Sequence, residues 1–195
     1  MNKETDCIGI VLLAAGNSKR FGGRKQFYPI HGKMMYLHIV DQLKQLSNTN
    51  KVLVTQFEEM KEQIDDFQII MNHQPEEGIS RSIHLGIDAL IQEKKSLSGV
   101  MFAVCDQPYL RMESLKCLVE QYKKSTKKIA CLSFQGKMGN PVIFHPDYLE
   151  ELQELSGDVG GKVIVKRHME EVLLVEVKEQ RELFDIDKKQ DIEKE

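Results

Sequence analysis

The residues most suited to chemistry lie in LLAAGNSKRFGGRKQ, residues 12–26, which holds three glycines and four cations but no acid. The segment follows an apolar run, so its loop lies beyond the carboxyl end of a strand, where open α/β sheets bind ligands. Glycines let backbone N–H groups approach phosphate oxygens, and Arg20 and Lys25 can donate charge-assisted hydrogen bonds. The segment predicts a phosphate-binding loop; a solvated basic surface loop is the alternative.

The positive charge of this loop is local. The 195-residue chain carries 27 Lys/Arg and 30 Asp/Glu, a formal net charge of −3, which argues against nucleic acid as a partner. Residues 8–33 nevertheless contain five Lys/Arg and no acid. We expect these cations to lack acidic partners, to repel one another and, with the glycines, to keep the loop open until a ligand binds.

A carboxylate closely follows a second apolar run. Asp106 comes after residues 100–104, at the expected carboxyl end of a strand and on the same edge as the first loop. Hard divalent cations bind carboxylate and phosphate oxygens. A cap for the helix expected near Met112 is the alternative, but Asp106 lies too early in the chain for that. We therefore expect Mg²⁺, or Mn²⁺ in its place, to bind here together with substrate phosphates.

The elements that must position these residues alternate along the chain. Runs typical of strands buried on both faces occur at residues 8–15, 51–55, 67–71 and 99–104. Apolar positions with helical spacing occur at residues 35–46, 79–90 and 115–122. Strands that alternate with helices predict βαβ units, and hence a mostly parallel sheet with helices on both faces.

The last third of the chain predicts a mixed arrangement. Strand-like runs occur at residues 129–134, 139–144 and 171–177, and helices are expected near residues 148–155 and 159–167. Their order predicts an antiparallel strand near one edge of the sheet. No repeat or Gly/Ser linker divides the sequence, so we predict one α/β domain over residues 1–195.

The composition also predicts a compartment. No apolar stretch approaches the roughly 20 residues that cross a bilayer, and the first residues are too polar for a signal peptide. The four cysteines show no CxxC spacing, which argues against a zinc ribbon or a redox motif. We expect a cytoplasmic protein with reduced thiols and no membrane partner.

The segment LAAGNSKRFGGRK resembles the signature L-A-A-G-x-S-x-R-x-G-x-x-K of nucleotidyltransferases of the molybdenum-cofactor type, most closely their molybdopterin cytidylyltransferase branch. Further segments resemble this family in the same order: EEGISRS (76–82), CDQPYL (105–110), GNPVIF (139–144), GDVGGK (157–162) and FDIDKKQDI (184–192). The resemblance spans nearly the whole chain. It implies a Rossmann-like nucleotidyltransferase fold and transfer of a nucleotidyl group from a triphosphate.

The resemblance also implies roles for individual residues. Arg20, Lys25 and Asp106 are expected to be catalytic, with Lys25 at the α-phosphate and Arg20 at the β- and γ-phosphates. Asp106 and Asp158 are the expected metal ligands. The expected nucleotide-binding residues are Leu13, Ala14, Ala15, Gly16, Asn17, Ser18, Lys25, Gly78, Ser80 and Ser82. The expected substrate-binding residues are Asn140 and Lys162.

Several of these residues have structural alternatives. Asp158 is well placed to cap a helix that begins at Val159, and Ser80 could cap the helix after Gly78. Lys162 stands where the family usually has Arg, so it keeps the charge but loses the bidentate fork. The ending at residues 184–192 is interpreted as a structural strand-to-helix closing element.

Three functional hypotheses follow. The first is a Mg²⁺-dependent enzyme that transfers CMP from CTP, or GMP from GTP, to molybdopterin, with in-line attack on the α-phosphate and release of pyrophosphate. The second keeps the fold but has a sugar-phosphate or polyol-phosphate acceptor. The third is a non-catalytic accessory protein that delivers the finished cofactor to a molybdenum hydroxylase, such as a xanthine dehydrogenase-type enzyme.

Overall fold

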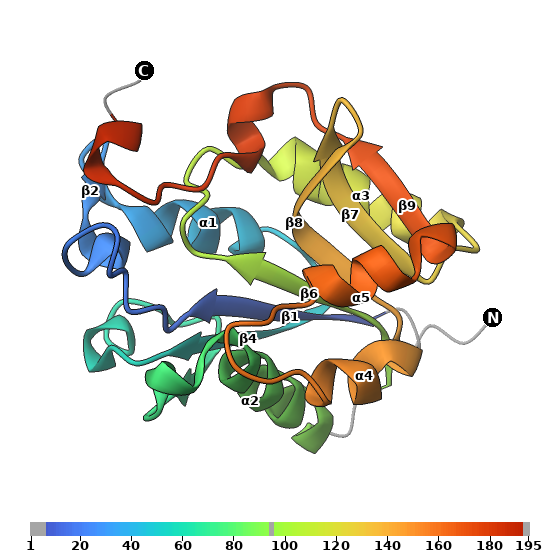
Figure 1. Cartoon of the computed structure of the whole chain (residues 1–195), viewed down its shortest axis with the longest axis horizontal. Coiled ribbons are helices and arrows are strands. Elements are labelled where there is room, and N and C mark those ends of the chain that lie inside the picture. The colour runs from blue at the N-terminus through green and yellow to red at the C-terminus, as the bar shows by residue number, and fades with distance from the viewer. Residues whose placement is uncertain (1–6, 94–95, 193–195) are drawn as a thin grey trace.

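The computed structural model describes residues 7–93 and 96–192 (Figure 1). At its centre is a seven-stranded sheet in the order β5-β4-β1-β6-β8-β7-β9, beside a small hairpin of β2 and β3. The strands are β1 Cys7–Ala14, β2 Pro29–Ile30, β3 Lys33–Met34, β4 Thr49–Thr55, β5 Gln68–Met71, β6 Leu97–Val104, β7 Ile129–Phe134, β8 Lys137–Phe144 and β9 Val172–Glu176.

The strand β1 lies between β4 and β6 and runs parallel to both. Ala14 pairs with Thr55, and Leu13 pairs with Val104, so the three strands end at one edge of the sheet. Burial on both faces explains why these strands read as continuous apolar runs. The segments that follow β1, β4 and β6 therefore emerge side by side.

The expected antiparallel element is β8, on the β9 side of the sheet. It runs antiparallel to both β6 and β7, whereas β9 runs parallel to β7. The predicted α/β fold, with a mostly parallel sheet, is confirmed. No helix within the described ranges is both long and apolar enough to cross a membrane.

Helices cover both faces of the sheet. They are α1 Met35–Lys44, α2 Ile79–Gln92, α3 Met112–Lys124, α4 Leu149–Gln153 and α5 Lys162–Arg167. Side chains alternate along β1, so Ile10 packs in the core with residues of α1 and α3, and Val11 packs on the opposite face with residues of α2, α4 and α5. Figure 1 shows α1 and α3 on one side of the sheet and α2 and α4 on the other.

The two structural alternatives, helix caps at Asp158 and Ser80, do not occur. The helix α5 begins at Lys162, its N-cap is Gly161, and no side chain caps it, so Asp158 does not cap this helix. The N-cap of α2 is Gly78 rather than Ser80, again without a side-chain bond. Gly78 has φ +89°, and a Cβ there would lie 2.3 Å from the carbonyl carbon of Gly157. Gly157 and Asp158 thus form a turn that packs against the start of α2. Because this turn is not helical, α5 begins only at Lys162.

The chain after β9 returns across the carboxyl edge of β6 (Figure 1). It contains two short 3-10 helices, Gln180–Leu183 and Lys189–Asp191, joined by residues 184–188. The expected strand-to-helix element is therefore wrong, because no strand forms within this described segment. We call residues 179–187 the C-terminal strap. Its position brings it to the edge where the first loop emerges.

Candidate active site

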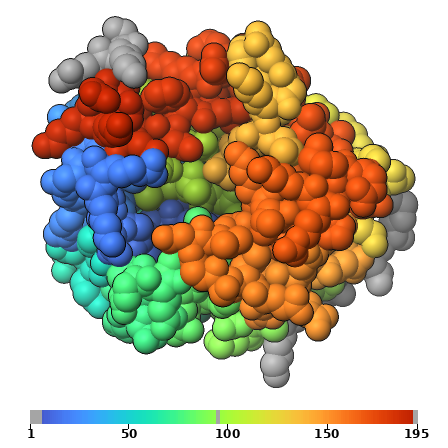
Figure 2. Space-filling view, in the orientation of Figure 1, coloured from blue at the N-terminus to red at the C-terminus, as the bar shows by residue number. Residues whose placement is uncertain are grey.

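A cavity of about 530 Å³ opens at the carboxyl edge of β1 and β6. Its lining comes from the loop after β1, the start of α2, the residues after β6, the Asp158 turn and Asp187 of the strap. Figure 2 shows the hollow between the first loop (blue), the segment that contains the Asp158 turn (orange) and the C-terminal segment (red). Segments that are distant in sequence thus meet around one space.

Most of the predicted nucleotide-binding residues line this cavity: Leu13, Ala15, Gly16, Asn17, Ser18, Lys25, Gly78 and Ser82. Ala14 and Ser80 do not. Ala14 is fully buried and faces the core, because it alternates with Leu13 along β1. Ser80 is 3% exposed, and its backbone N–H donates to Gly157 O at 3.2 Å. Neither residue lines the cavity, and their expected role in nucleotide binding remains a prediction.

Two glutamines that the sequence analysis did not single out hold the first loop. Gln26 is 1% exposed, and its Nε2 donates to Gly16 O at 2.7 Å. Gln56 Nε2 donates to Ala15 O at 2.8 Å and to Asn17 Oδ1 at 3.0 Å. Gln56 follows β4 directly, so its place at the carboxyl edge was a signal that could have identified it.

Lys25 is buried against two carboxylates. Its Nζ lies 2.6 Å from Asp106 Oδ2 and 3.5 Å from Asp187 Oδ1, and it donates to Ile186 O at 3.2 Å. Burial by itself would lower the pKa of Lys25, but the adjacent Asp106 carboxylate raises this pKa above its ordinary value. Asp106 Oδ1 is buried and has no hydrogen-bond partner among the described residues. That oxygen is therefore an unsatisfied acceptor in this structure.

Asp187 is a further site residue that the sequence analysis did not single out. It accepts from Arg20 Nη1 at 2.8 Å as well as contacting Lys25, so one carboxylate bridges two of the predicted catalytic cations. The sequence placed it in a segment interpreted as purely structural. Its signal was the acidic pair in FDID, at the start of the segment 184–192 that resembles the family.

The prediction that the cations of the first loop lack acidic partners is wrong. Four of them form ion pairs with acids from other segments: Arg20 with Asp187, Arg24 with Glu59, Lys25 with Asp106 and Lys33 with Asp41. Counting acids within residues 8–33 could not reveal partners that the fold supplies. The loop is consequently held by both glutamine bonds and ion pairs.

A second cavity, of about 220 Å³, contains both predicted substrate-binding residues, Asn140 and Lys162. Gln107 also lines it, and Gln107 Nε2 donates to Asp185 Oδ1 at 2.9 Å. Partial burial, together with the negative charge of Asp106, raises the pKa of Asp185 to about 6. Aromatic side chains of Phe134 and Phe184 complete part of the lining.

The two cavities share a wall. Asp106 lines the first and its neighbour Gln107 lines the second, while in the strap Asp187 lines the first and Asp185 the second. The wall is joined by a backbone hydrogen bond from Ile186 N to Asp106 O of 2.9 Å. This arrangement can present one reactant on each side of the same pair of segments.

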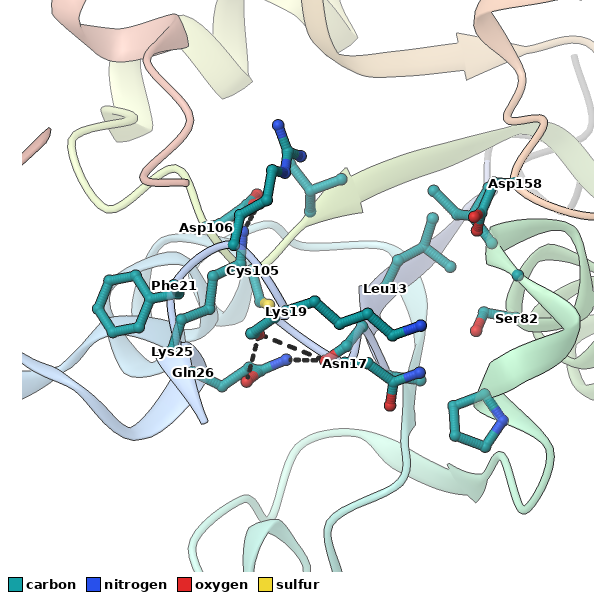
Figure 3. Close-up of a pocket in the computed structure, with 18 of the residues that line it drawn as sticks. Leu13, Asn17, Lys19, Phe21, Lys25, Gln26, Ser82, Cys105, Asp106 and Asp158 are labelled. Carbon is teal, nitrogen blue, oxygen red and sulfur yellow. Dashed lines mark hydrogen bonds and ion pairs between the residues drawn. The ribbon is translucent and has the colours of Figure 1, made fainter. Parts of the chain in front are cut away.

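The charges of the first cavity bear on metal binding. Its lining holds three Lys/Arg and four Asp/Glu, an acidic excess that disfavours an anionic ligand unless a cation accompanies it. No group of three or more His, Cys, Asp or Glu suited to a metal ion occurs in the part of the chain that the structure describes. In Figure 3, Asp106 and Asp158 lie on opposite sides of the cavity. Their joint metal role remains a prediction.

The fold and this cavity define an α/β protein with a ligand site at the carboxyl edge of its parallel strands. The chain belongs to the MobA-like NTP transferase domain family, whose pattern matches residues 10–172. It is therefore a nucleotidyltransferase.

The chain is similar to curated relatives of two kinds. It is 26% identical over 147 residues to the probable molybdenum cofactor guanylyltransferase of Pyrococcus horikoshii, a match that covers 75% of this chain and 72% of that protein. It is 30% identical over 136 residues to the bifunctional protein GlmU of Oceanobacillus iheyensis, which covers 67% of this chain. The chain spans only 29% of the length of that GlmU protein.

Solved structures show the same fold. The Rv0371c homologue from Mycobacterium sp. strain JC1 superimposes with a TM-score of 0.79 at 21% identity, over 97% of this chain and 94% of that one. The complex of Mycobacterium tuberculosis Rv0371c with manganese has a TM-score of 0.71 at 17% identity, over 88% of each chain. At such identities the likeness establishes the fold alone.

Proposed function

We propose that this protein transfers CMP from CTP to the phosphate group of molybdopterin and releases pyrophosphate, with Mg²⁺ as its cofactor. The observation that carries the proposal is the shared wall. Asp106 faces the cavity that contains the phosphate-binding loop, and Gln107 faces the cavity that contains Asn140 and Lys162. A nucleotide on one side and an acceptor on the other would meet at this wall.

The triphosphate belongs in the first cavity. The loop after β1 offers small residues there, and the bonds from Gln26 and Gln56 occupy its carbonyl oxygens rather than its N–H groups. Arg20 and Lys25 lie at the same side of the cavity, where they can exchange their carboxylate partners for phosphate oxygens. Lys25 then contacts the α-phosphate and Arg20 the β- and γ-phosphates.

The residues present fit a divalent cation. Asp106 has a buried carboxylate oxygen without a hydrogen-bond partner. The Asp187 carboxylate contacts Lys25, as Asp106 does, and Asp158 lines the opposite side of the cavity. Because no three acidic, His or Cys side chains of the described residues form a complete ligand set, a cation that completes its shell with phosphate oxygens and water suits the site. When bound, Mg²⁺ supplies positive charge that neutralises the phosphate oxygens. The manganese complex of Rv0371c supports a divalent cation, and Mn²⁺ is an expected substitute for Mg²⁺.

Transfer needs no protein nucleophile. A phosphate monoester has a second pKa near 6, so an acceptor phosphate is already mostly dianionic at neutral pH. Its oxygen attacks the α-phosphorus in line, the new P–O bond forms, and the bond to pyrophosphate breaks. The protein contributes position and charge: Lys162 and Asn140 orient the acceptor while Lys25 and Arg20 hold the donor.

The choice of substrates rests on similarity. The Pyrococcus horikoshii relative is named a molybdenum cofactor guanylyltransferase, which supports molybdopterin as acceptor and makes GTP the competing donor. The signature in residues 13–25 resembles the cytidylyltransferase branch, and we therefore favour CTP. We place the reaction in the cytoplasm and expect a molybdenum hydroxylase of the xanthine dehydrogenase type to receive the product.

The test is a matrix of donors and acceptors. The protein is incubated with CTP, GTP or ATP, with Mg²⁺, and with molybdopterin, a sugar phosphate or a polyol phosphate, and pyrophosphate is measured. We expect release with CTP and molybdopterin. Release with a sugar or polyol phosphate instead would overturn the acceptor. Capture of the finished dinucleotide cofactor without turnover for any pair would indicate a delivery protein.

A further inference from the structure

Lys19 is exposed and lines the first cavity, yet its ammonium group has no partner within residues 7–93 and 96–192. The neighbouring cations differ, because Arg20 pairs with Asp187 and Lys25 pairs with Asp106. Lys19 also occupies a position that the signature in residues 13–25 leaves open to any residue. The positive charge of Lys19 at the cavity is therefore explained neither by an ion pair of the described residues nor by the signature.

The backbone that carries Lys19 is anchored although its side chain is not. The preceding Ser18 has φ +51°, its carbonyl accepts from Phe21 N at 3.0 Å, and its hydroxyl donates to Gln26 Oε1 at 3.3 Å. This tight turn fixes the Cα of Lys19 at the rim. Figure 3 shows the Lys19 side chain extending across the cavity, away from Asp106.

Lys19 differs from the other cations of the cavity lining because its charge is not neutralised by an acid of the described residues. Of the three Lys/Arg in the lining, Arg20 and Lys25 already neutralise acids. A triphosphate can reach them only after their ion pairs open, and breaking a buried pair such as Lys25–Asp106 is costly. Lys19 requires no such exchange. Its charge also reaches the rim, where an approaching anion arrives first.

We propose that Lys19 is the residue that captures the triphosphate, through its β- and γ-phosphates, before Arg20 and Lys25 exchange their carboxylates for phosphate oxygens. The inference rests on the proposed function, since it requires that a nucleoside triphosphate bind in the first cavity. Lys19 then determines how fast the triphosphate associates and how strongly that association rate depends on salt. A nucleoside lacks the phosphates on which this step depends, so its binding does not use Lys19.

The test compares Lys19→Met, which keeps the aliphatic stem but removes the charge, with Lys19→Arg, which keeps the charge. Association of CTP with the Mg²⁺-loaded protein is followed by stopped-flow fluorescence from about 50 to 500 mM NaCl. We expect Lys19→Met to lower the association rate about tenfold at low salt and to flatten its salt dependence, because electrostatic steering raises on-rates by 10-fold or more. Lys19→Arg restores both, and kcat/KM falls more than kcat in Lys19→Met.

The matched control is Lys33→Met, because Lys33 pairs with Asp41 and lies outside the cavity lining. Its association rate should equal that of the unmodified protein. A wild-type association rate and salt slope in Lys19→Met would overturn the inference, while leaving the proposed function intact. Failure of the unmodified protein to bind any triphosphate would overturn both, so the two failures are distinguishable.

Discussion

Lys25 Nζ and Asp106 Oδ2 lie 2.6 Å apart although 81 positions separate the two residues in the chain. The pair joins the first loop, which follows β1, to the segment after β6. Without a nucleotide, the predicted phosphate ligand and the predicted metal ligand neutralise each other. Substrate binding must therefore replace an interaction that already exists, and this relationship shapes the predictions below.

Replacing Asp106 tests its role in chemistry. We expect Asp106→Asn to lower kcat by about a hundredfold or more, because metal-assisted charge stabilisation contributes several kcal/mol to the transition state. The variant should remain folded, since Lys25 keeps Asp187 and Ile186 O as partners. The loss of one charged partner should lower Tm by about 2–6 °C. Pyrophosphate release and thermal melting check the two parts, and near-normal turnover with Mg²⁺ would refute the metal role.

Two lysines of the same segment should differ sharply. Lys25→Ala should lose about a hundredfold in kcat, because Lys25 is buried beside Asp106 at the expected position of the α-phosphate. Lys33→Ala should change kcat less than twofold, because Lys33 makes an exposed ion pair with Asp41 on the protein surface. Steady-state kinetics on both variants measure this. Equal losses would show that only the overall charge of the loop matters.

The pKa of Asp185 predicts a pH dependence of stability. In the folded protein this pKa is about 6, above the ordinary value of 3.8. The folded state therefore holds this proton more tightly than the unfolded state, and stability falls as pH rises from about 4 to about 6. Asp185→Asn should raise Tm at pH 7.5, by about 1–3 °C, and the gain should shrink towards pH 4. Melting curves across this range decide it; a gain that is constant with pH would contradict the prediction.

Nucleotide binding should be visible in the first loop. Although Gln26 and Gln56 fix its carbonyl oxygens, Gly16 and Gly23 remain exposed and make few apolar contacts. We expect CTP with Mg²⁺ to slow amide exchange across residues 16–25, whereas cytidine does not, because only the triphosphate supplies acceptors for the loop. Hydrogen-exchange mass spectrometry resolves this segment. Protection confined to α2 would show that the phosphates bind elsewhere.

The parts of the structure that could be predicted are those that local pattern determines. The apolar run of β1 and the run before Asp106 each identify a buried strand, and parallel strands bring the residues that follow them to one edge. The pairing of Lys25 with Asp187 could not be predicted from local pattern, because the two residues are 162 positions apart in the sequence and only the fold brings them together. The start of α5 was misjudged for a similar reason. Asp158 is a good N-cap residue by type, but contact of Gly157 with Gly78 overrides that preference.

The strap has a consequence for how the protein is made. Asp187 lines the first cavity and Asp185 the second, and the strap that carries them is held by the bonds from Ile186 N to Asp106 O and from Gln107 Nε2 to Asp185 Oδ1. A nascent chain can form β1, β6 and the first loop while it is still attached to the ribosome. Neither cavity has its full lining until the C-terminal strap has been synthesised and has packed against residues 106 and 107. A chain that stops before the C-terminal strap therefore lacks one carboxylate from the lining of each cavity.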